Sequence, residues 1–411
     1  MSIRSTLFPE TRAHAFLAAL SLSALCACGG GGGSGSSSTG PFDGGAGFNN
    51  TVLAITFADD SGGDLYVGGI FTDYDGNPAR QVARLNADGS FDSKFNTGIG
   101  FNSSIADIAP ATDGSRDIWV GGGFTDYNGT TVPRIVRLNS NGTIDSAFST
   151  GAGFDGSIET ILPAADGSGD VYVGGTFTTY QGESQNRIAR LNADGTLDSS
   201  FDVGTGLDGR VSDIQFAPDG SGDLYVSGSF TTYQGVNRPR ITRINPDGSN
   251  DASFATGTGF DASVERLAVA RDNSGDIYAI GMFTIFRGNA RQNIARVNSD
   301  GSNDGDFTPG TGFNGNPQDI ALVGDGSGDF YISGDFTAYD GQAAPSLIRI
   351  DAMGTAVNSF DVGSGPNTSF VFLAPTEDQS GNLYIAGTFV SFNGAPVSRG
   401  ILRLDPLGQP N

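Results

Sequence analysis

The chain has 411 residues, of which 64 are glycine, and its 45 acidic and 22 basic residues give a formal net charge of -23. So acidic a chain repels phosphate, which excludes nucleic acid as an expected partner. The single histidine, His14, and the two cysteines, Cys26 and Cys28, all lie near the N-terminus. The rest of the chain therefore has neither imidazole nor thiol for catalysis or zinc binding, and it has no disulfide framework.

The segment 1–27 has the pattern of a secretion signal. Arg4 and Arg12 accompany a polar start, and the apolar stretch 13–25 is shorter than the roughly 20 residues that cross a bilayer. The segment Leu25-Cys26-Ala27-Cys28 resembles the lipobox of bacterial lipoproteins. The resemblance implies that 1–27 is removed and that Cys28 becomes the lipid-modified first residue. The alternative is an ordinary secreted protein that is cut near the same place.

Residues 28–40 are almost entirely Gly and Ser, a composition that predicts a flexible tether. Gly29, rather than Asp, follows the lipobox cysteine, which by the same resemblance indicates the outer membrane. We therefore expect a bacterial protein that is held at the outer membrane or cell surface by a lipid anchor. The membrane is its first expected partner.

Phenylalanines recur every 53 residues through the rest of the chain. One series is Phe71, Phe124, Phe177, Phe230, Phe283, Phe336 and Phe389, and a second is Phe95, Phe148, Phe201, Phe254, Phe307 and Phe360. Extrapolating the second series backwards reaches Phe42, whereas the seventh copy stops before its own second phenylalanine. Residues 41–411 therefore hold seven copies, with the missing part of the last copy placed at the start.

An open array of repeats needs a distinct cap at each end, and this one has none. A closed ring explains the displaced piece and leaves no sheet edge exposed. Within the third copy, the segments 157–162, 171–178, 186–192 and 196–202 have the pattern of short strands separated by Gly-rich turns. The sequence predicts an all-β fold, a seven-bladed β-propeller of 53-residue four-stranded repeats, closed by the N-terminal strand that completes the last blade.

The same copy carries the motifs of a known repeat. They are Gly174, Gly175, Phe177 and Thr178, then Ile188 to Gly195, then Asp198 and Phe201. This pattern resembles the delta-60 repeat family of bacterial β-propellers, and it recurs in phase through 41–411. The resemblance implies a propeller fold and an extracytoplasmic location, and it brings no activity with it.

A turn of the form Asp-Gly-Ser-Gly-Asp recurs in several copies, with Asp166, Ser168 and Asp170 as its oxygen-bearing residues in the third. Calcium loops begin with oxygens at these spacings, so the three residues are candidate calcium ligands. The bidentate acid that should follow is replaced by Phe177. The alternative is a hairpin turn in which Asp bonds its own backbone. We expect no other cofactor.

Arginines and aspartates form a further phased set of pairs. They are Arg84 with Asp92, Arg137 with Asp145, Arg190 with Asp198, Arg243 with Asp251, and Arg296 with Asp304. Because each pair flanks a short turn symmetrically, we expect structural ion pairs between adjacent strands. Arg349 lacks such a partner, since Val357 occupies its place, and Arg403 would face Thr39.

Two series of aromatic residues have different expected roles. Tyr66, Trp119, Tyr172, Tyr225, Tyr278, Tyr331 and Tyr384 fall in the middle of a strand, which predicts packing between blades rather than a sugar-binding surface. Tyr74, Tyr127, Tyr180, Tyr233 and Tyr339 fall in the loop that follows, where we expect partial exposure and ligand contact is an open alternative.

Blades four and five, residues 207–313, are rich in arginine, and Arg287 departs there from the usual Gln. Arg287 and Arg291 are therefore candidate ligand-binding residues, through which a positive sector could receive an anionic polymer or an acidic protein. The alternative is that these arginines arose by random variation among surface residues and have no common role.

The function that these features favour is a non-enzymatic binding or scaffold protein, with an unknown protein or carbohydrate ligand. The alternative is an enzyme at the central channel, such as a lactonase-like or glycoside-processing hydrolase, and whether the chain is an enzyme stays open. Such a hydrolase would use Asp or one of the four later glutamates, Glu159, Glu183, Glu265 and Glu377. No catalytic pair can be singled out among so many aspartates.

Overall fold

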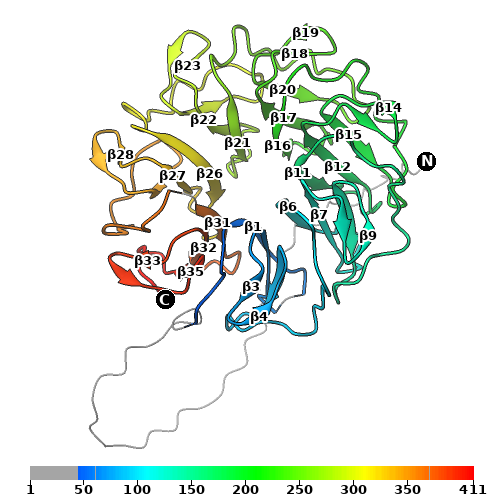
Figure 1. Ribbon diagram of the computed structural model, residues 1–411. Coiled ribbons are helices and arrows are strands. Elements are labelled where there is room, and N and C mark those ends of the chain that lie inside the picture. The colour runs from blue at the N-terminus through cyan, green and yellow to red at the C-terminus, as the bar shows by residue number, and fades with distance from the viewer. Residues whose placement is uncertain (1–44, 61, 370) are drawn as a thin grey trace, which may run out of the picture. The chain divides into compact units, whose positions relative to one another are not determined.

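The computed structural model describes residues 45–60, 62–369 and 371–411 (Figure 1). Over these residues the chain forms seven three-stranded antiparallel sheets, one for each 53-residue copy, arranged around a common centre. This arrangement confirms the predicted seven-bladed β-propeller. The predicted signal peptide 1–27, the tether 28–40, Cys28 and Phe42 lie outside the described residues.

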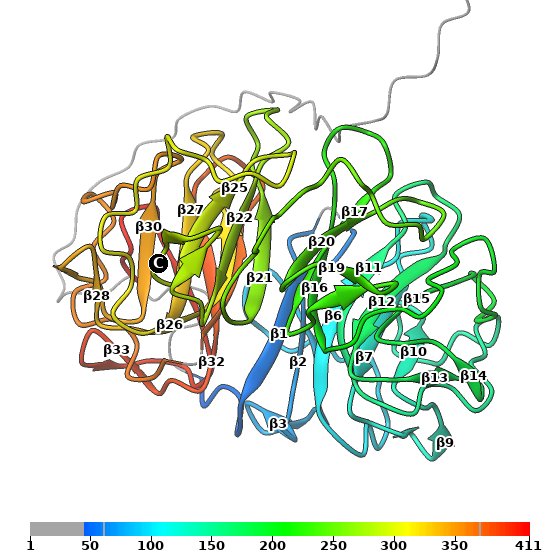
Figure 2. The same cartoon turned by 90° about the horizontal axis from the view of Figure 1, so that it is seen from above.

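The first strand of each sheet lies nearest the centre of the ring, as Figures 1 and 2 show from two directions at right angles. These inner strands are β1 (Val52–Phe57), β6 (Ile105–Pro110), β11 (Ile158–Pro163), β16 (Val211–Phe216), β21 (Val264–Val269), β26 (Asn316–Leu322) and β31 (Val371–Pro375).

The second strand of each copy pairs with the inner strand on one side and with a third strand on the other. The middle strands are β2 (Leu65–Gly69), β7 (Ile118–Gly122), β12 (Val171–Gly175), β17 (Leu224–Gly228), β22 (Ile277–Gly281), β27 (Phe330–Asp335) and β32 (Leu383–Gly387). The third strands are β5 (Val82–Leu85), β10 (Ile135–Leu138), β15 (Ile188–Leu191), β20 (Ile241–Ile244), β25 (Ile294–Val297), β30 (Leu347–Ile350) and β35 (Ile401–Leu404).

A very short hairpin, which the sequence analysis took for a loop, connects the second and third strands. The pairs are β3 (Asp73–Tyr74) with β4 (Asn77–Pro78), β8 (Asp126–Tyr127) with β9 (Thr130–Thr131), β13 (Thr179–Tyr180) with β14 (Glu183–Ser184), β18 (Thr232–Tyr233) with β19 (Val236–Asn237), β23 (Ile285–Phe286) with β24 (Asn289–Ala290), β28 (Ala338–Tyr339) with β29 (Gln342–Ala343), and β33 (Ser391–Phe392) with β34 (Ala395–Pro396).

The prediction of a fourth strand in each blade is wrong. In the third copy, segment 196–202 joins the sheet only through one bridge, between Leu191 and Leu197. The chain then turns, because the carboxylate of Asp198 accepts a hydrogen bond of 2.8 Å from the backbone N–H of Ser200. Aspartate favours such turns over extended structure. Each described sheet therefore has three strands and a short edge segment instead of four strands.

The paired glycines of the repeat allow neighbouring blades to approach closely. A Cβ atom on Gly174 would lie 2.4 Å from Val211 of the next inner strand, and one on Gly175 would lie 2.1 Å from the carbonyl oxygen of Ser157. Real Cβ atoms do not tolerate such distances. The Gly-Gly motif is thus explained by packing between and within blades.

The backbone contact that closes the ring is of the same kind as the contact between consecutive blades along the chain. The backbone N–H of Phe101 donates to the carbonyl of Arg80 in the preceding blade, at 3.4 Å. At the closure, Phe48 donates in the same way to Arg399 of the last blade, at 2.9 Å, and Gly47 forms a parallel bridge with Arg399. One buried cluster includes Phe48 together with Tyr384 of the last blade. The first and last copies are therefore neighbours in the ring.

Candidate functional site

In the first six blades, the outer-strand arginine lies between carboxylates and an aromatic ring, in an arrangement we call the arginine clamp. In the fourth blade, the guanidinium of Arg243 lies 2.7 Å from Asp223 and 3.3 Å from Asp251, and it also contacts Asp219. Its Cζ lies 5.5 Å from the centre of the Tyr225 ring, because the sheet register places the two residues opposite each other. The clamp buries the guanidinium and keeps it paired, while Asp219 stays partly exposed.

The clamp recurs around the ring. The predicted pairs of arginine with aspartate are confirmed, at 3.1–3.5 Å, for Arg84, Arg137, Arg190, Arg243 and Arg296. Arg349 has no acid at Val357, as predicted, and pairs instead with Asp325 and Asp329 at 2.7 and 2.8 Å. The prediction for Arg403 involves Thr39, which lies outside the described residues. These repeated pairs are structural.

The candidate calcium ligands belong to the same clamp. Asp166 and Asp170 lie 3.2 and 2.8 Å from the guanidinium of Arg190, and the hydroxyl of Ser168 accepts a hydrogen bond from the backbone of Asp170. Arg190 thus supplies the positive charge that calcium would supply. Within the described ranges, no group of three or more His, Cys, Asp or Glu side chains has the arrangement of a metal site.

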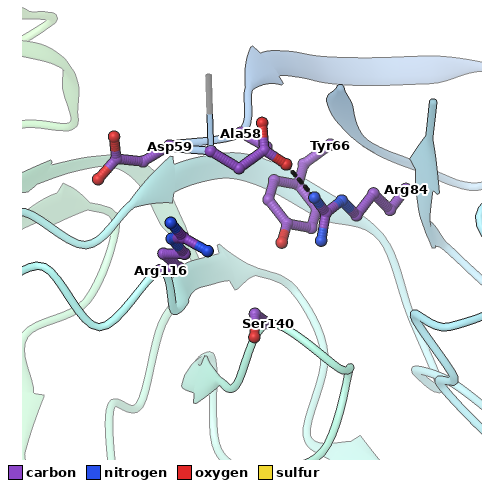
Figure 3. A pocket seen from close by; sticks show the side chains of 7 residues that line it. Ala58, Asp59, Tyr66, Arg84, Arg116 and Ser140 are labelled. Carbon is purple, nitrogen blue, oxygen red and sulfur yellow. Dashed lines mark hydrogen bonds and ion pairs between the residues drawn. The ribbon is translucent and has the colours of Figure 1, made fainter. Parts of the chain in front are cut away.

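In the fourth blade, the clamp also lowers the pKa of Asp219. Burial by itself raises the pKa of Asp219, but hydrogen bonds from Ser221 and the guanidinium of Arg243 outweigh it and bring the pKa to about 2. In the first blade, Arg84 pairs with Asp60 beside Tyr66, next to a cavity of about 150 Å³ that Arg116 also lines (Figure 3). The cavity is large enough for a few water molecules, and Asp59 and Arg116 line it together with the clamp residues Asp60 and Arg84.

The two aromatic series are both buried. The mid-strand series packs between blades as predicted, and the hydroxyl of Tyr225 donates to the carbonyl of Gly275 in the next blade at 3.0 Å. The second series was expected to be partly exposed, and this expectation is wrong. Tyr180 is 1% exposed because Phe154 packs on its ring at 4.5 Å and its hydroxyl donates to the carbonyl of Gly195.

Arg287 and Arg291 do not form a free positive sector. Arg287 donates to the backbone carbonyls of Ala255 and Gly301, and Arg291 donates to those of Ala290 and Asp304. Other arginines of blades four and five are also engaged, as in the 2.6 Å pair between Arg210 and Glu265. The structure brings Arg287 and Arg291 to one hairpin, β23 with β24, where both bind main-chain oxygens.

Charged residues that the sequence analysis missed occur at one phased position of the inner strands. The position holds Asp107 in β6, Asp213 in β16, Arg266 in β21 and Asp319 in β26. Arg266 interacts electrostatically with all three aspartates, and its Nε lies 4.0 Å from Asp319. Because these strands lie nearest the centre of the ring (Figure 1), we call the three acids of this group the channel aspartates. The sequence did contain a signal for this group, because an aspartate recurs at the same position of every second repeat.

Each channel aspartate also joins two neighbouring blades. Both oxygens of Asp319 accept backbone hydrogen bonds, one from Ile320 of its own strand at 3.0 Å and one from Leu373 of the next blade at 2.8 Å. Asp107 and Asp213 bond the following blades in the same way, through Ile161 and Leu267. The channel carboxylates therefore connect successive inner strands.

Burial has the largest effect on the pKa of these carboxyl groups. It raises the pKa of both Asp107 and Asp319 to about 6, in spite of the hydrogen bonds and the charge of Arg266 that favour ionisation. Burial likewise raises the pKa of Asp213. Raised carboxyl pKa values in a channel are a feature of acid–base catalysts, but also of buried structural acids.

We predict that stability falls as the pH rises from 5 to 7. Over this range folded Asp319, with a pKa of about 6, gives up a proton that the unfolded chain has already lost near pH 4. Each such group lowers the free energy of unfolding at pH 7 by on the order of 2 kcal/mol. Urea unfolding at pH 5, 6 and 7 measures the slope.

The variant Asp319→Asn should show a flatter slope than the wild type, whatever its absolute stability. Asp194→Asn is the matched control, because hydrogen bonds from Thr196 hold the pKa of Asp194 below its ordinary value. That control should keep the wild-type slope between pH 5 and 7. Equal slopes for wild type and Asp319→Asn would contradict the prediction.

The glutamates do not gather at one place. Glu265 accepts hydrogen bonds from Ser263 and Arg210, whereas Glu183 lies on an exposed hairpin. Glu377 pairs with Arg271, at 3.3 Å.

In the described part of the chain, no helix has the length and apolar character needed to cross a membrane.

Comparisons with known proteins agree with this architecture. The family model described as domain of unknown function (DUF5122) beta-propeller matches residues 63–95, 118–148, 167–201 and 217–254, one stretch in each of the first four blades. No curated protein matches the chain.

Two solved structures are similar in fold. The WD40 beta propeller domain of Doa1 is 14% identical, with a TM-score of 0.55 over 87% of this chain and 93% of that one. A chain of the Mitotic Checkpoint Complex is 13% identical, with a TM-score of 0.52 over 94% of this chain and all of that one. At such identities the likeness is evidence for the propeller fold alone.

Proposed function

We propose that this protein is a lipid-anchored, extracytoplasmic β-propeller, built from repeats of the delta-60 kind, that acts as a non-enzymatic binding or scaffold platform. The observation that supports the proposal is that the recurrent charged residues contact other groups of the propeller itself. The arginine clamps pair segments of one blade, and the channel aspartates accept backbone hydrogen bonds from the next blade. The result is a rigid support whose faces are available for a protein or carbohydrate ligand.

The lipobox at Cys28 and the Gly/Ser tether support placement at the outer membrane or cell surface. Metabolic labelling of the full chain with a palmitate analogue in a Gram-negative host, followed by membrane fractionation, tests this part. We expect label in the wild type and in Cys26→Ala, because Cys26 belongs to the removed signal, and none in Cys28→Ala. An unlabelled wild type, or a label that persists in Cys28→Ala, would contradict lipid anchoring.

The alternative function, a hydrolase at the central channel, has one observation in its favour, namely the pKa of about 6 for Asp107 and Asp319. Against it, both oxygens of each carboxyl group accept backbone hydrogen bonds from two blades. Hydrolysis of a panel of glycosides and lactones that Asp319→Asn abolishes, while the variant stays folded, would favour the enzyme over the scaffold.

A further inference from the structure

The cavity of about 150 Å³ in Figure 3 lies where the first blade meets the second. Tyr66 and Arg84 of the first blade line it together with Arg116 and Ser140 of the second. At about 30 Å³ for each molecule of liquid water, its volume corresponds to about five waters, which is also the size of a small amino acid. The polar groups that face the cavity without a partner decide what it can hold.

The hydroxyl of Tyr66 is one of these groups. Tyr66 is 2% exposed, and Figure 3 shows its hydroxyl directed into the space between Arg84 and Arg116. In the fourth blade the equivalent hydroxyl, that of Tyr225, donates at 3.0 Å to the carbonyl of Gly275 in the next blade. Arg116 has the position of Gly275 here, and the Tyr66 hydroxyl has no hydrogen-bond partner among the described residues. Because an unpartnered buried donor is costly, a ligand that accepts from it is favoured.

Arg116 itself replaces a glycine of the repeat. Its φ is 65°, a left-handed conformation that glycine adopts without strain and arginine does not. The other six blades have glycine at this position, namely Gly63, Gly169, Gly222, Gly275, Gly328 and Gly381. Arg116 is exposed, and it forms no ion pair with any residue that the structure describes. The second blade therefore brings an unpaired cation to the cavity at a place where its neighbours have no side chain.

Asp59 is the acid of the cavity that has no arginine partner. Arg84 is already paired with Asp60, whereas Asp59 is exposed and has no ion pair within the described ranges. The cavity thus offers one unpaired cation, Arg116, and one unpaired anion beside the tyrosine hydroxyl. A simple anion would be repelled by a chain with a net charge of -23. A zwitterion is neutral overall and complements both charges.

We propose that this cavity binds a small zwitterion of the size of glycine or alanine. Arg116 and the hydroxyl of Tyr66 donate to its carboxylate, and Asp59 accepts from its ammonium group. The inference goes beyond the proposed function, because it adds a small-molecule ligand to the platform. Lipid anchoring is independent of this site, so the labelling experiment above and the binding experiment below can fail separately.

Glycine is the probe, and its affinity for the full folded chain without the signal peptide is measured by calorimetry and by saturation-transfer NMR. Glycine should bind at least about tenfold more tightly than methylamine, which lacks the carboxylate, since hydrogen bonds to charged groups are among the strong ones. It should bind about threefold or more tightly than acetate, which lacks the ammonium group, because an ion pair with the exposed Asp59 contributes less.

Arg116→Gly is the decisive variant, because it restores the residue of the other six blades. It should weaken glycine binding by about tenfold or more, since it removes the cation. It should not lower the melting temperature, because glycine suits a positive φ. Tyr66→Phe should weaken binding by about threefold to tenfold through the loss of one donor. Asp59→Asn should reduce the affinity for glycine to that for acetate.

Tyr172→Phe and Arg271→Gln are the matched controls, and both should leave glycine binding unchanged. Tyr172 has the place of Tyr66 in the third blade, where the following blade has Gly222 instead of an arginine. Arg271 is an exposed arginine of the fifth blade. The inference is overturned if glycine does not bind, if acetate or methylamine binds as tightly as glycine, or if folded Arg116→Gly keeps the wild-type affinity.

Discussion

Replacing Arg243 by methionine should lower the free energy of unfolding by about 3 kcal/mol, which is a large part of the stability of a domain. Methionine keeps much of the side-chain volume but leaves Asp223 and Asp251 without their cation. The two carboxylates lie 2.7 and 3.3 Å from the guanidinium and are largely buried, so their charges lack compensation from solvent. The contact with the Tyr225 ring is lost as well. Urea unfolding at pH 7 measures the effect.

The control for this prediction is Arg271→Met, which breaks an ion pair that is exposed on both sides. We expect that variant to lose less than about 1 kcal/mol, since exposed pairs contribute little. Similar losses for the two variants would show that the clamp behaves as a surface ion pair. In that case the carboxylates would be hydrated, and the clamp would not hold the outer strand.

Replacing Phe48 by alanine should destabilise the fold by about 3–5 kcal/mol, the usual cost of removing a fully buried phenylalanine. Phe48 is buried at the closure of the ring, where its ring centre lies 4.3 Å from Phe71 and 4.6 Å from Tyr74. The hydrogen bond from its backbone N–H to Arg399 connects the same segment to the last blade. Thermal and urea unfolding of the variant measure the loss.

Phe154→Ala is the matched comparison, because Phe154 occupies the same place at an internal junction, 4.4 Å from Phe177 and 4.5 Å from Tyr180. The two variants should lose similar stability if the closure is as well packed as the junctions along the chain. A loss below about 1 kcal/mol for Phe48→Ala, with a full loss for Phe154→Ala, would mean that the ring opens at this point in solution.

The sequence predicted only some of the contacts in the arginine clamp. Arg190 and Asp198 flank a short turn, so local spacing predicted their contact correctly. Asp166 and Asp170 lie 24 and 20 residues before Arg190, across a hairpin whose register the sequence does not state. Read alone, their turn resembles the start of a calcium loop. The partner that supplies the positive charge becomes visible only when the outer strand lies beside the middle one.

The burial of Tyr180 and the ion pair between Arg271 and Glu377 have the same kind of cause. Tyr180 lies in a polar stretch, and Phe154, which precedes the inner strand of that blade, packs on its ring. Arg271 and Glu377 follow the inner strands of the fifth and seventh blades, and they meet because the ring bends through two blades between them. Neither contact has a local signal, because each depends on how segments distant in the sequence pack together.

By itself, the sequence determined the number of blades, the closed ring and the burial of the mid-strand aromatics, because these follow from a 53-residue period and from alternation within single strands. The tertiary structure alone decided which charges meet, which tyrosines are covered and where a pocket opens. Those properties depend on register and on distances between blades, which residue spacing along one chain does not specify.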